Sequence, residues 1–185
     1  SLDMDYADSL EYKDEEVKCI TEELEILKQR GIADPEHFFN PTEDDLFPLD
    51  SLYRIDEAFD RLDKAIKENE KIAILFDTDL DGTASGAIIT RYLRNFTNNI
   101  ETYIDEGKQH GLIGQDIEKF FDVDLLIVVD SLDKNELQYK KLYENKTDVI
   151  ILDHHAIKES VPYDDYSILV SSQRKYSNPQ LSGTG

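Results

Sequence analysis

Three short apolar runs, each followed directly by an aspartate, constrain the fold of this chain more than any other feature. The runs and their aspartates are residues 72–76 with Asp77, residues 125–129 with Asp130, and residues 149–152 with Asp153. Continuous apolar runs of this length are typical of strands buried on both faces of a parallel sheet. Parallel strands place their carboxyl ends along one edge, where ligands bind, so we expect the three aspartates to converge there.

The segments between these runs show helical periodicity, so strands and helices alternate along the chain. The further elements predicted are helices over residues 17–31, 55–66, 82–96 and 134–145, a short helix ending at Phe121, and strands over residues 100–104 and 168–170. This order predicts an α/β fold, a three-layer sandwich with a mainly parallel sheet. In the helix over 82–96, the side chains expected to face the sheet are Ala84, Ile88, Tyr92 and Phe96.

The chain is predicted to have two parts. Residues 1–50 combine an acidic helical segment with a connection that contains Pro35, Pro41 and Pro48, whereas residues 51–185 hold the alternating strands and helices. We therefore expect an N-terminal helical segment followed by one α/β domain.

The formal net charge of −21 restricts the partners of this chain. A mainly acidic surface repels polyphosphate chains, so a nucleic-acid partner requires a local basic groove or bridging metal ions. Cys19 is the single cysteine, which excludes an intramolecular disulfide and a cysteine zinc cluster. No apolar stretch approaches the roughly 20 residues of a membrane span, and no signal-peptide pattern is present. We expect a cytoplasmic protein with no membrane partner; its oligomeric state stays open.

The strongest motif is the hexapeptide Asp77-Thr78-Asp79-Leu80-Asp81-Gly82, directly after the first apolar run. Carboxylates at alternate positions beyond a strand can be directed at one point, and Gly82 allows a tight turn or a close approach of substrate. The following helix is expected to offer amides of residues 83–85 to a phosphate. The alternative is a plain acidic loop in an acidic protein.

Asp153 opens a second motif with His154 and His155. Carboxylate oxygens together with imidazole suit Mn²⁺, Mg²⁺ or Zn²⁺, and several converging anions repel one another unless a cation lies among them. A metal site is the prediction. Asp130 by itself could instead cap the helix near Lys134, and the loop over residues 108–111 could either reach this edge or be a surface loop.

The C-terminal segment is rich in hydroxyl groups and glycine. Arg174 lies within the polar run 171–175, and Ser182 and Gly183 begin a glycine-rich turn that ends at Gly185. Such groups can bind a phosphate, so Arg174, Ser182 and Gly183 are candidate substrate-binding residues.

In this order and spacing, the hexapeptide, Asp130 and the Asp-His-His triplet resemble the DHH phosphoesterase superfamily. Upstream, Arg30-Gly31-Ile32, Asn40-Pro41 and Asp44-Asp45-Leu46 resemble RecJ-type single-stranded-DNA exonucleases. The turn over residues 182–185 is similar to that family's fourth motif. The resemblance covers about residues 24 to 185.

The resemblance implies a metal-dependent nuclease with two ions, Mn²⁺ or Mg²⁺, that activate water and clamp the phosphoryl oxygens. The implied metal ligands are Asp79, Asp81, Asp130 and His154, with Asp77 and Asp153 as ligands or orienting residues. His155 would contact the scissile phosphate or protonate the leaving oxygen, and Asp130 would also belong to the catalytic set. The implied substrate is single-stranded nucleic acid, DNA before RNA, degraded from a 5′ end in DNA repair or recombination.

The sequence also departs from that family. Asp130-Ser131-Leu132 stands where the family commonly has Asp-Asn-Gly, and a further metal-binding aspartate and a second, substrate-gripping domain are expected after the glycine-rich motif. These departures leave open whether the chain as given is active.

Three alternatives follow from the same residues. A small phosphoester or short oligonucleotide suits an acidic protein better than a long strand does. Residues 79–83 also match a haloacid-dehalogenase signature, in which Asp79 is the nucleophile, but that leaves the histidine pair unexplained. The third alternative is a binding module with a DHH-like fold and no catalysis.

Overall fold

The computed structural model describes residues 22–105, 111–176 and 178–185. The chain divides into two compact units, Ser1–Leu46 and Phe47–Gly185. No helix in the described part of the chain combines the length and apolar character needed to cross a bilayer.

In the first unit, residues 22–29 are helical, followed by α2 (Pro35–Phe39) and the 3₁₀ turn η1 (Glu43–Asp45). The predicted first helix is confirmed over those residues, and its positions 17–21 lie outside the described part. The Asp34 side chain begins α2 by accepting a hydrogen bond from the His37 amide at 2.9 Å.

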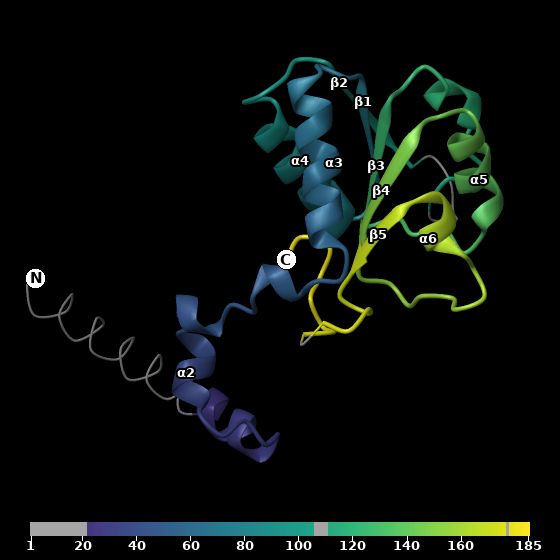
Figure 1. Ribbon diagram of the computed structural model, residues 1–185. Coiled ribbons are helices and arrows are strands. Elements are labelled where there is room, and N and C mark those ends of the chain that lie inside the picture. The colour runs from purple at the N-terminus through teal and green to yellow at the C-terminus, as the bar shows by residue number, and fades with distance from the viewer. Residues whose placement is uncertain (1–21, 106–110, 177) are drawn as a thin grey trace, which may run out of the picture. The chain divides into compact units, whose positions relative to one another are not determined.

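The second unit is built on a five-stranded sheet in which every strand is parallel to its neighbours (Figure 1). The strands are β1 (Ile72–Phe76), β2 (Ile100–Ile104), β3 (Leu125–Val129), β4 (Asp148–Asp153) and β5 (Ile168–Ser171), in the order β2-β1-β3-β4-β5. All five predicted strands are present, so the α/β prediction is confirmed, and the sheet is wholly parallel.

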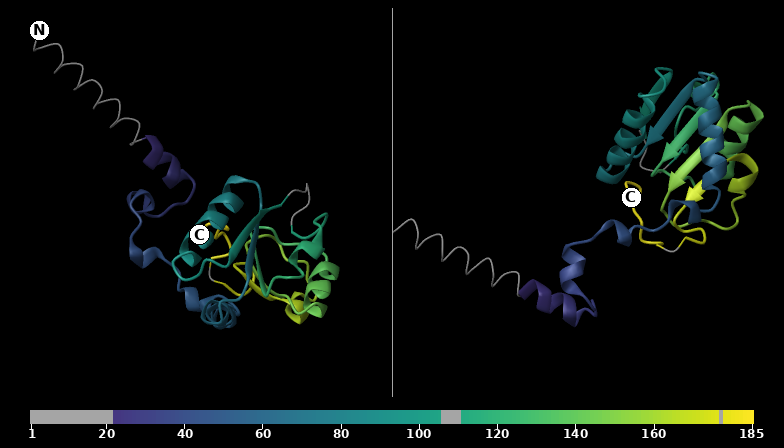
Figure 2. Two further views of the ribbon diagram at one scale, coloured as in Figure 1. Left: turned by 90° about the horizontal axis from the view of Figure 1, so that it is seen from above. Right: turned by 60° about the vertical axis from the view of Figure 1, so that its left-hand side comes forward.

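Helices cover both faces of this sheet (Figures 1 and 2). On one face lie α3 (Ile55–Lys67) and α4 (Leu80–Leu93), with η2 (Leu49–Ser51) leading into α3. The other face carries η3 (Ile117–Phe120), α5 (Glu136–Glu144) and α6 (Tyr163–Tyr166). The buried apolar side chains accordingly form two clusters, and every residue of β3 is buried because that strand lies at the centre of the sheet.

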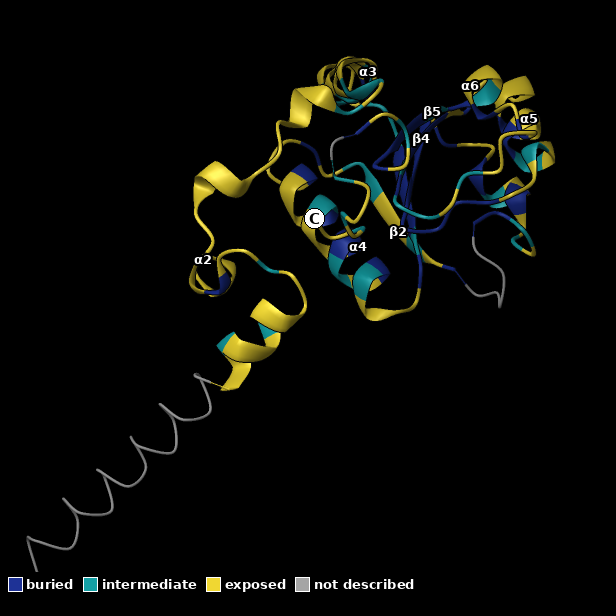
Figure 3. Cartoon of the chain, turned by 90° about the horizontal axis from the view of Figure 1, so that it is seen from below, coloured by how far each residue is buried: buried dark blue, intermediate teal, exposed yellow. Residues whose placement is uncertain are grey.

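The orientation of α4 differs from the prediction. Ile88, Tyr92 and Phe96 were expected to face the sheet, yet each is more than half exposed, and Figure 3 shows much of α4 as exposed. The buried residues of this helix are mostly small: Gly82, Ser85, Gly86, Thr90 and Leu93.

Close contact between the helix backbone and the sheet explains this orientation. A Cβ atom at Gly86 would lie 2.5 Å from the ring of Phe76, so only glycine allows this approach. Small residues therefore line the contact, and the large apolar side chains point outward.

Substitution Gly86→Ala tests this packing. In an isolated helix the change would stabilise by about 1 kcal/mol, but the clash with Phe76 is of the kind that costs about 1–3 kcal/mol. We expect a net loss in the free energy of unfolding, measured by urea denaturation. The control is Ala87→Gly at an exposed position of the same helix, where the change in the free energy of unfolding reports helix propensity alone. A Gly86→Ala variant that is more stable than the unchanged chain would contradict the packing.

Candidate metal centre

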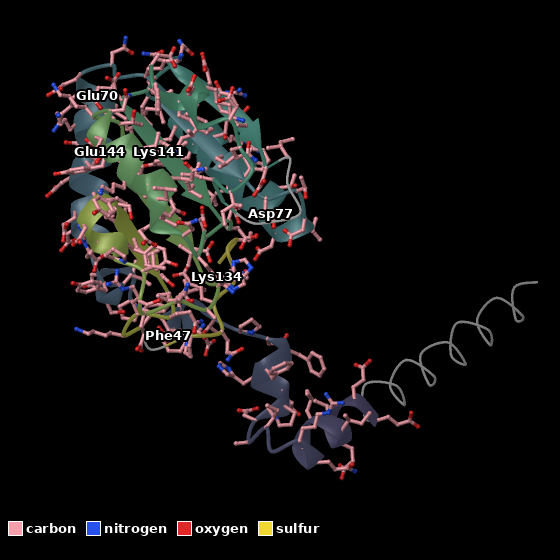
Figure 4. All side chains as sticks on the ribbon, turned by 90° about the vertical axis from the view of Figure 1, so that its right-hand side faces the viewer. Phe47, Glu70, Asp77, Lys134, Lys141 and Glu144 are labelled. Carbon is pink, nitrogen blue, oxygen red and sulfur yellow. The ribbon has the colours of Figure 1, made fainter. Side chains whose placement is uncertain are left out.

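Strand register brings the three predicted aspartates to one edge of the sheet. Phe76 of β1 pairs with Val129 of β3, and Val129 pairs with Leu152 of β4, so the next residue of each strand is Asp77, Asp130 or Asp153. Figure 4 shows Asp77 at the end of the sheet away from Glu70. The predicted convergence at the carboxyl edge follows directly from this in-register parallel pairing.

Asp130 lies at the centre of this edge and is 1% exposed. Its backbone adopts the left-handed conformation, with φ of 53°, and its amide donates to the Leu152 carbonyl at 3.0 Å. Its Oδ1 atom lies 3.1 Å from Nε2 of His154 and 3.7 Å from Nδ1 of His155. No hydrogen bond of acceptable geometry reaches this buried oxygen from the described residues.

The electrostatic environment of Asp130 opposes its ionisation. Burial, followed by repulsion from the carboxylates of Asp153 and Asp81, raises the pKa of Asp130 to about 6. A cation at this position would remove that repulsion and supply the partner that the Asp130 oxygen lacks.

Asp81 is held by the C-terminal turn, 102 residues further along the chain. Its Oδ2 accepts the Gly183 amide and its Oδ1 the Thr184 amide, both at 2.8 Å, and the Thr184 hydroxyl also donates to Oδ1. Burial opposes ionisation here, but these donors outweigh it and hold the pKa of Asp81 below its usual value. The Asp81 Oδ2 atom lies 3.5 Å from Nε2 of His154.

Gly183 also contacts the central aspartate. A Cβ atom at this position would lie 2.9 Å from Cγ of Asp130, so the turn fits against both carboxylates only with glycine here. Figures 1 and 2 show this C-terminal segment in yellow beneath the carboxyl edge of the sheet. In this arrangement, the Gly183 and Thr184 amides bind a protein carboxylate. Thr184 is a site residue that the sequence interpretation did not single out.

Asp153 orients the second histidine. Its Oδ2 accepts the Leu132 amide at 2.8 Å, and its Oδ1 accepts the His155 amide at 2.5 Å and lies 2.9 Å from His155 Nδ1. The hydrogen bond to Asp153 is the main reason that the pKa of His155 is raised. This contact fixes the imidazole ring and directs Nε2 away from Asp153.

The first motif forms a helix start. Asp79 caps α4, because its Oδ1 accepts the Gly82 amide at 2.8 Å. The helix begins at Leu80, and the Thr83 amide already donates to the Asp79 carbonyl at 3.0 Å. The expectation that amides of residues 83–85 bind a phosphate is therefore wrong. The residue that approaches Gly82 closely is Asp77. A Cβ atom added at Gly82 would lie 2.7 Å from the Cβ atom of Asp77.

The remaining predicted residues have other surroundings. Asn135, which accepts the Leu137 amide at 3.0 Å, caps α5, so the alternative role of Asp130 as that helix cap is wrong. Arg174 is paired with Asp164 at 2.5 Å and lies 4.6 Å from the ring centre of Tyr53.

Two further predictions concern loops. The Ser182 hydroxyl accepts the Gly185 amide at 3.2 Å, within the turn that holds Asp81. Residues 108–110 lie outside the described part of the chain, so neither alternative for this loop, reaching the carboxyl edge or lying on the surface, is tested. Gly111, which follows them, donates its amide to the Ser131 hydroxyl at 2.7 Å.

The donor set fits a hard or borderline divalent cation. One ligand atom each from Asp130, His154 and His155 lies within 4.8 Å of the others, and Asp81 adjoins them. Carboxylate oxygen with imidazole suits Mn²⁺ and Zn²⁺, and carboxylates alone suit Mg²⁺. The buried Asp130 oxygen without a hydrogen-bond donor is the feature that a bound cation explains best.

Residues 71–185 match the model of the DHH family, N-terminal domain. The chain belongs to the DHH family. It is 34% identical over 164 residues to YorK of Bacillus subtilis (strain 168), which is named as a prophage-derived single-strand DNA-specific exonuclease; the match covers 86% of this chain and 28% of YorK. It is 30% identical over 188 residues to the single-stranded-DNA-specific exonuclease RecJ of the same organism, covering 92% of this chain and 24% of RecJ.

Among solved structures, exonuclease RecJ bound to manganese superposes with a TM-score of 0.62 and 26% identity, covering 72% of this chain and 35% of that one. The chain spans about a quarter of the length of the two curated relatives. Because the chain belongs to the DHH family, the haloacid-dehalogenase alternative is excluded.

The contact between Thr184 and Asp81 predicts a specific effect on metal affinity. Loss of a group that orients a ligand typically weakens binding by about 10- to 100-fold, so we expect Thr184→Val to weaken Mn²⁺ binding by this factor in calorimetry. Thr184→Ser keeps the hydroxyl and should retain the affinity. Equal Mn²⁺ affinity in both variants, with both folded by circular dichroism, would show that the hydroxyl does not orient Asp81.

Proposed function

We propose that this chain carries out metal-dependent phosphodiester hydrolysis, as the DHH part of a RecJ-like exonuclease that degrades single-stranded DNA from a 5′ end. The observation that carries the proposal is the convergence of Asp81, Asp130 and His154 around a buried carboxylate oxygen without a hydrogen-bond donor. The names of the relatives support the substrate.

The proposed ligands of two Mn²⁺ or Mg²⁺ ions are Asp79, Asp81, Asp130 and His154. When bound, such ions lower the pKa of a water molecule and neutralise charge on the phosphoryl oxygens. The protein orients the side chains that would bind the ions. The turn at Gly183 and Thr184 fixes the Asp81 carboxylate, and Asp77 stands at the end of β1 as a ligand or an orienting residue.

His155 has a separate role in the proposal. Asp153 holds Nδ1 and favours the protonated ring, so Nε2 can donate a proton to the leaving oxygen or a hydrogen bond to the scissile phosphate. Asp153 therefore acts through His155, as a positioning residue.

The substrate phosphate has room beside the cluster. A hollow of about 730 Å³ is lined by Asp79, Leu80, Asp81, Ala84, Ser182 and Thr184. Ser182 and Gly183 are proposed to border the bound strand. Arg174, paired with Asp164, could contact it only after exchanging that partner.

Two other functions can be distinguished from this one by a hydrolysis assay. A short oligonucleotide or small phosphoester is the alternative substrate, favoured by the net charge of −21. A non-catalytic binding module is the alternative class. Single strands labelled at either end, and a small phosphodiester in parallel, distinguish them in a Mn²⁺-dependent hydrolysis assay.

The two histidines are proposed to have different roles, which substitutions can separate. His155→Ala should lower turnover by about 10²- to 10⁴-fold, the usual contribution of a general acid, while Mn²⁺ affinity falls much less. His154→Ala should lower both, because His154 is proposed as a metal ligand. Turnover is measured on the labelled strand, and Mn²⁺ affinity by calorimetry.

The matched control is Asp122→Asn, which removes an exposed carboxylate that pairs with Lys71 at the opposite edge of the sheet. It should change neither quantity. Equal loss of metal by the two histidine variants would reverse the assigned roles, and absence of hydrolysis with intact Mn²⁺ binding would favour the binding module.

A further inference from the structure

A fourth aspartate stands at the carboxyl edge of the sheet and has no part in the proposed chemistry. Phe76 of β1 pairs with Ile104 of β2, so Asp105 follows β2 just as Asp77 follows β1. Asp105 is 1% exposed, and its amide donates to the Phe76 carbonyl at 2.9 Å. The sequence interpretation missed this residue because the strand before it is not a continuous apolar run.

The Asp105 carboxylate accepts hydrogen bonds from two side chains. The Gln115 amide group donates to Oδ1 at 2.8 Å, and the Ser131 hydroxyl donates to Oδ2 at 2.9 Å. Lys119 in turn donates to the Gln115 oxygen at 2.9 Å. The Gly111 amide donates to the Ser131 hydroxyl at 2.7 Å. Because ammonium and backbone amide groups can only donate, these outer partners leave the side-chain NH₂ of Gln115 and the Ser131 proton for Asp105.

This network holds the turn that carries Asp130. Ser131, which directly follows Asp130, is fully buried. The next amide, that of Leu132, donates to the Asp153 carboxylate at 2.8 Å. The turn after β3 is therefore tied to the aspartate that follows β2 on one side and to the last residue of β4 on the other, although β1 lies between β2 and β3.

The conformation of Asp130 requires such support. Its φ of 53° is left-handed, which is unfavourable for a residue with a Cβ atom and persists where the surroundings impose it. Its Oδ1 atom, which lies 3.1 Å from Nε2 of His154, receives no hydrogen bond of acceptable geometry from the described residues. The direction of this carboxylate therefore follows from the backbone of the turn and from the groups packed around it.

We propose that Asp105 is a positioning residue for the metal centre: through the Ser131 hydroxyl, it holds the left-handed turn that directs the Asp130 carboxylate toward the metal. The inference rests on the proposed function and adds a residue that acts through Ser131 rather than on the ion. The competing explanation is a purely structural network that anchors Gly111 to the sheet and has no effect on metal affinity.

The test compares two losses of a buried hydroxyl in the whole chain. Ser131→Ala removes the link between Asp105 and the turn without changing the net charge. Thr147→Val removes a hydroxyl that is also buried and donates to the Phe120 carbonyl at 3.1 Å, beside the first residue of β4 at the opposite edge of the sheet. Both changes should lower the free energy of unfolding in urea. Only Ser131→Ala should weaken Mn²⁺ binding in calorimetry, by about 10- to 100-fold.

A reciprocal exchange of donor and acceptor supplies the rescue. D105N leaves one of the two donors, Gln115 or Ser131, without an acceptor and should also weaken Mn²⁺ binding. D105N/Q115E places an acceptor at position 115, so the introduced amide can donate to it and still accept from Ser131. The net charge is then that of the unchanged chain, and the double variant should recover most of the affinity that D105N loses. Failure of this recovery, with S131A binding Mn²⁺ as tightly as T147V, overturns the proposal.

A measurement without metal follows the turn itself. In NMR spectra recorded in chelator, a left-handed residue gives a strong nuclear Overhauser effect between its own amide and α protons. T147V should keep this effect at Asp130, and S131A should weaken it. An S131A variant that keeps both this effect and the Mn²⁺ affinity shows that Asp105 has a structural role only.

The inference and the proposed function can fail separately. If the unchanged chain neither binds Mn²⁺ nor hydrolyses a labelled strand, the proposed function fails, while a weakened Overhauser effect in S131A alone still upholds the hold of Asp105 on the turn. If S131A and D105N bind Mn²⁺ and hydrolyse the strand as the unchanged chain does, the catalytic proposal stands and the positioning role is overturned.

Discussion

Burial of the Asp130 carboxylate at the centre of the sheet's carboxyl edge is the constraint on which the site depends. β3 is flanked by β1 and β4 in register, so Asp130 emerges between Asp77 and Asp153 with little access to water. Burial, and then the neighbouring carboxylates of Asp153 and Asp81, raise its pKa to about 6, so the fold gathers acidic groups where their ionisation is unfavourable. Such an arrangement is typical of a functional site, and the proposed cation would relieve the repulsion.

The C-terminal turn completes this centre from a distant part of the sequence. Gly183 and Thr184 bind the Asp81 carboxylate, and the absence of a side chain on Gly183 lets the turn contact Asp130 as well. The Gly183 amide, which was expected to face a phosphate, therefore helps to stabilise the ionised form of one proposed metal ligand. Two of these hydrogen bonds come from backbone amides and a third from the Thr184 hydroxyl, so the orientation of Asp81 depends on both the path of the turn and the Thr184 side chain.

The chain is strongly acidic, and the arginines of its second unit have different surroundings. Arg54, Arg61 and Arg174 are held by carboxylates, whereas Arg91 and Arg94 are exposed and form no ion pair with any described residue.

The sequence by itself determined the α/β class and the convergence of the three strand-end aspartates, because apolar runs that end in aspartate specify buried parallel strands and place their polar residues at one edge. Tertiary structure decided the rest. The outward direction of Tyr92 on α4 depends on how closely Gly86 approaches Phe76, which helical spacing does not reveal. The contact of Thr184 with Asp81 joins segments about a hundred residues apart, so no local pattern could indicate it.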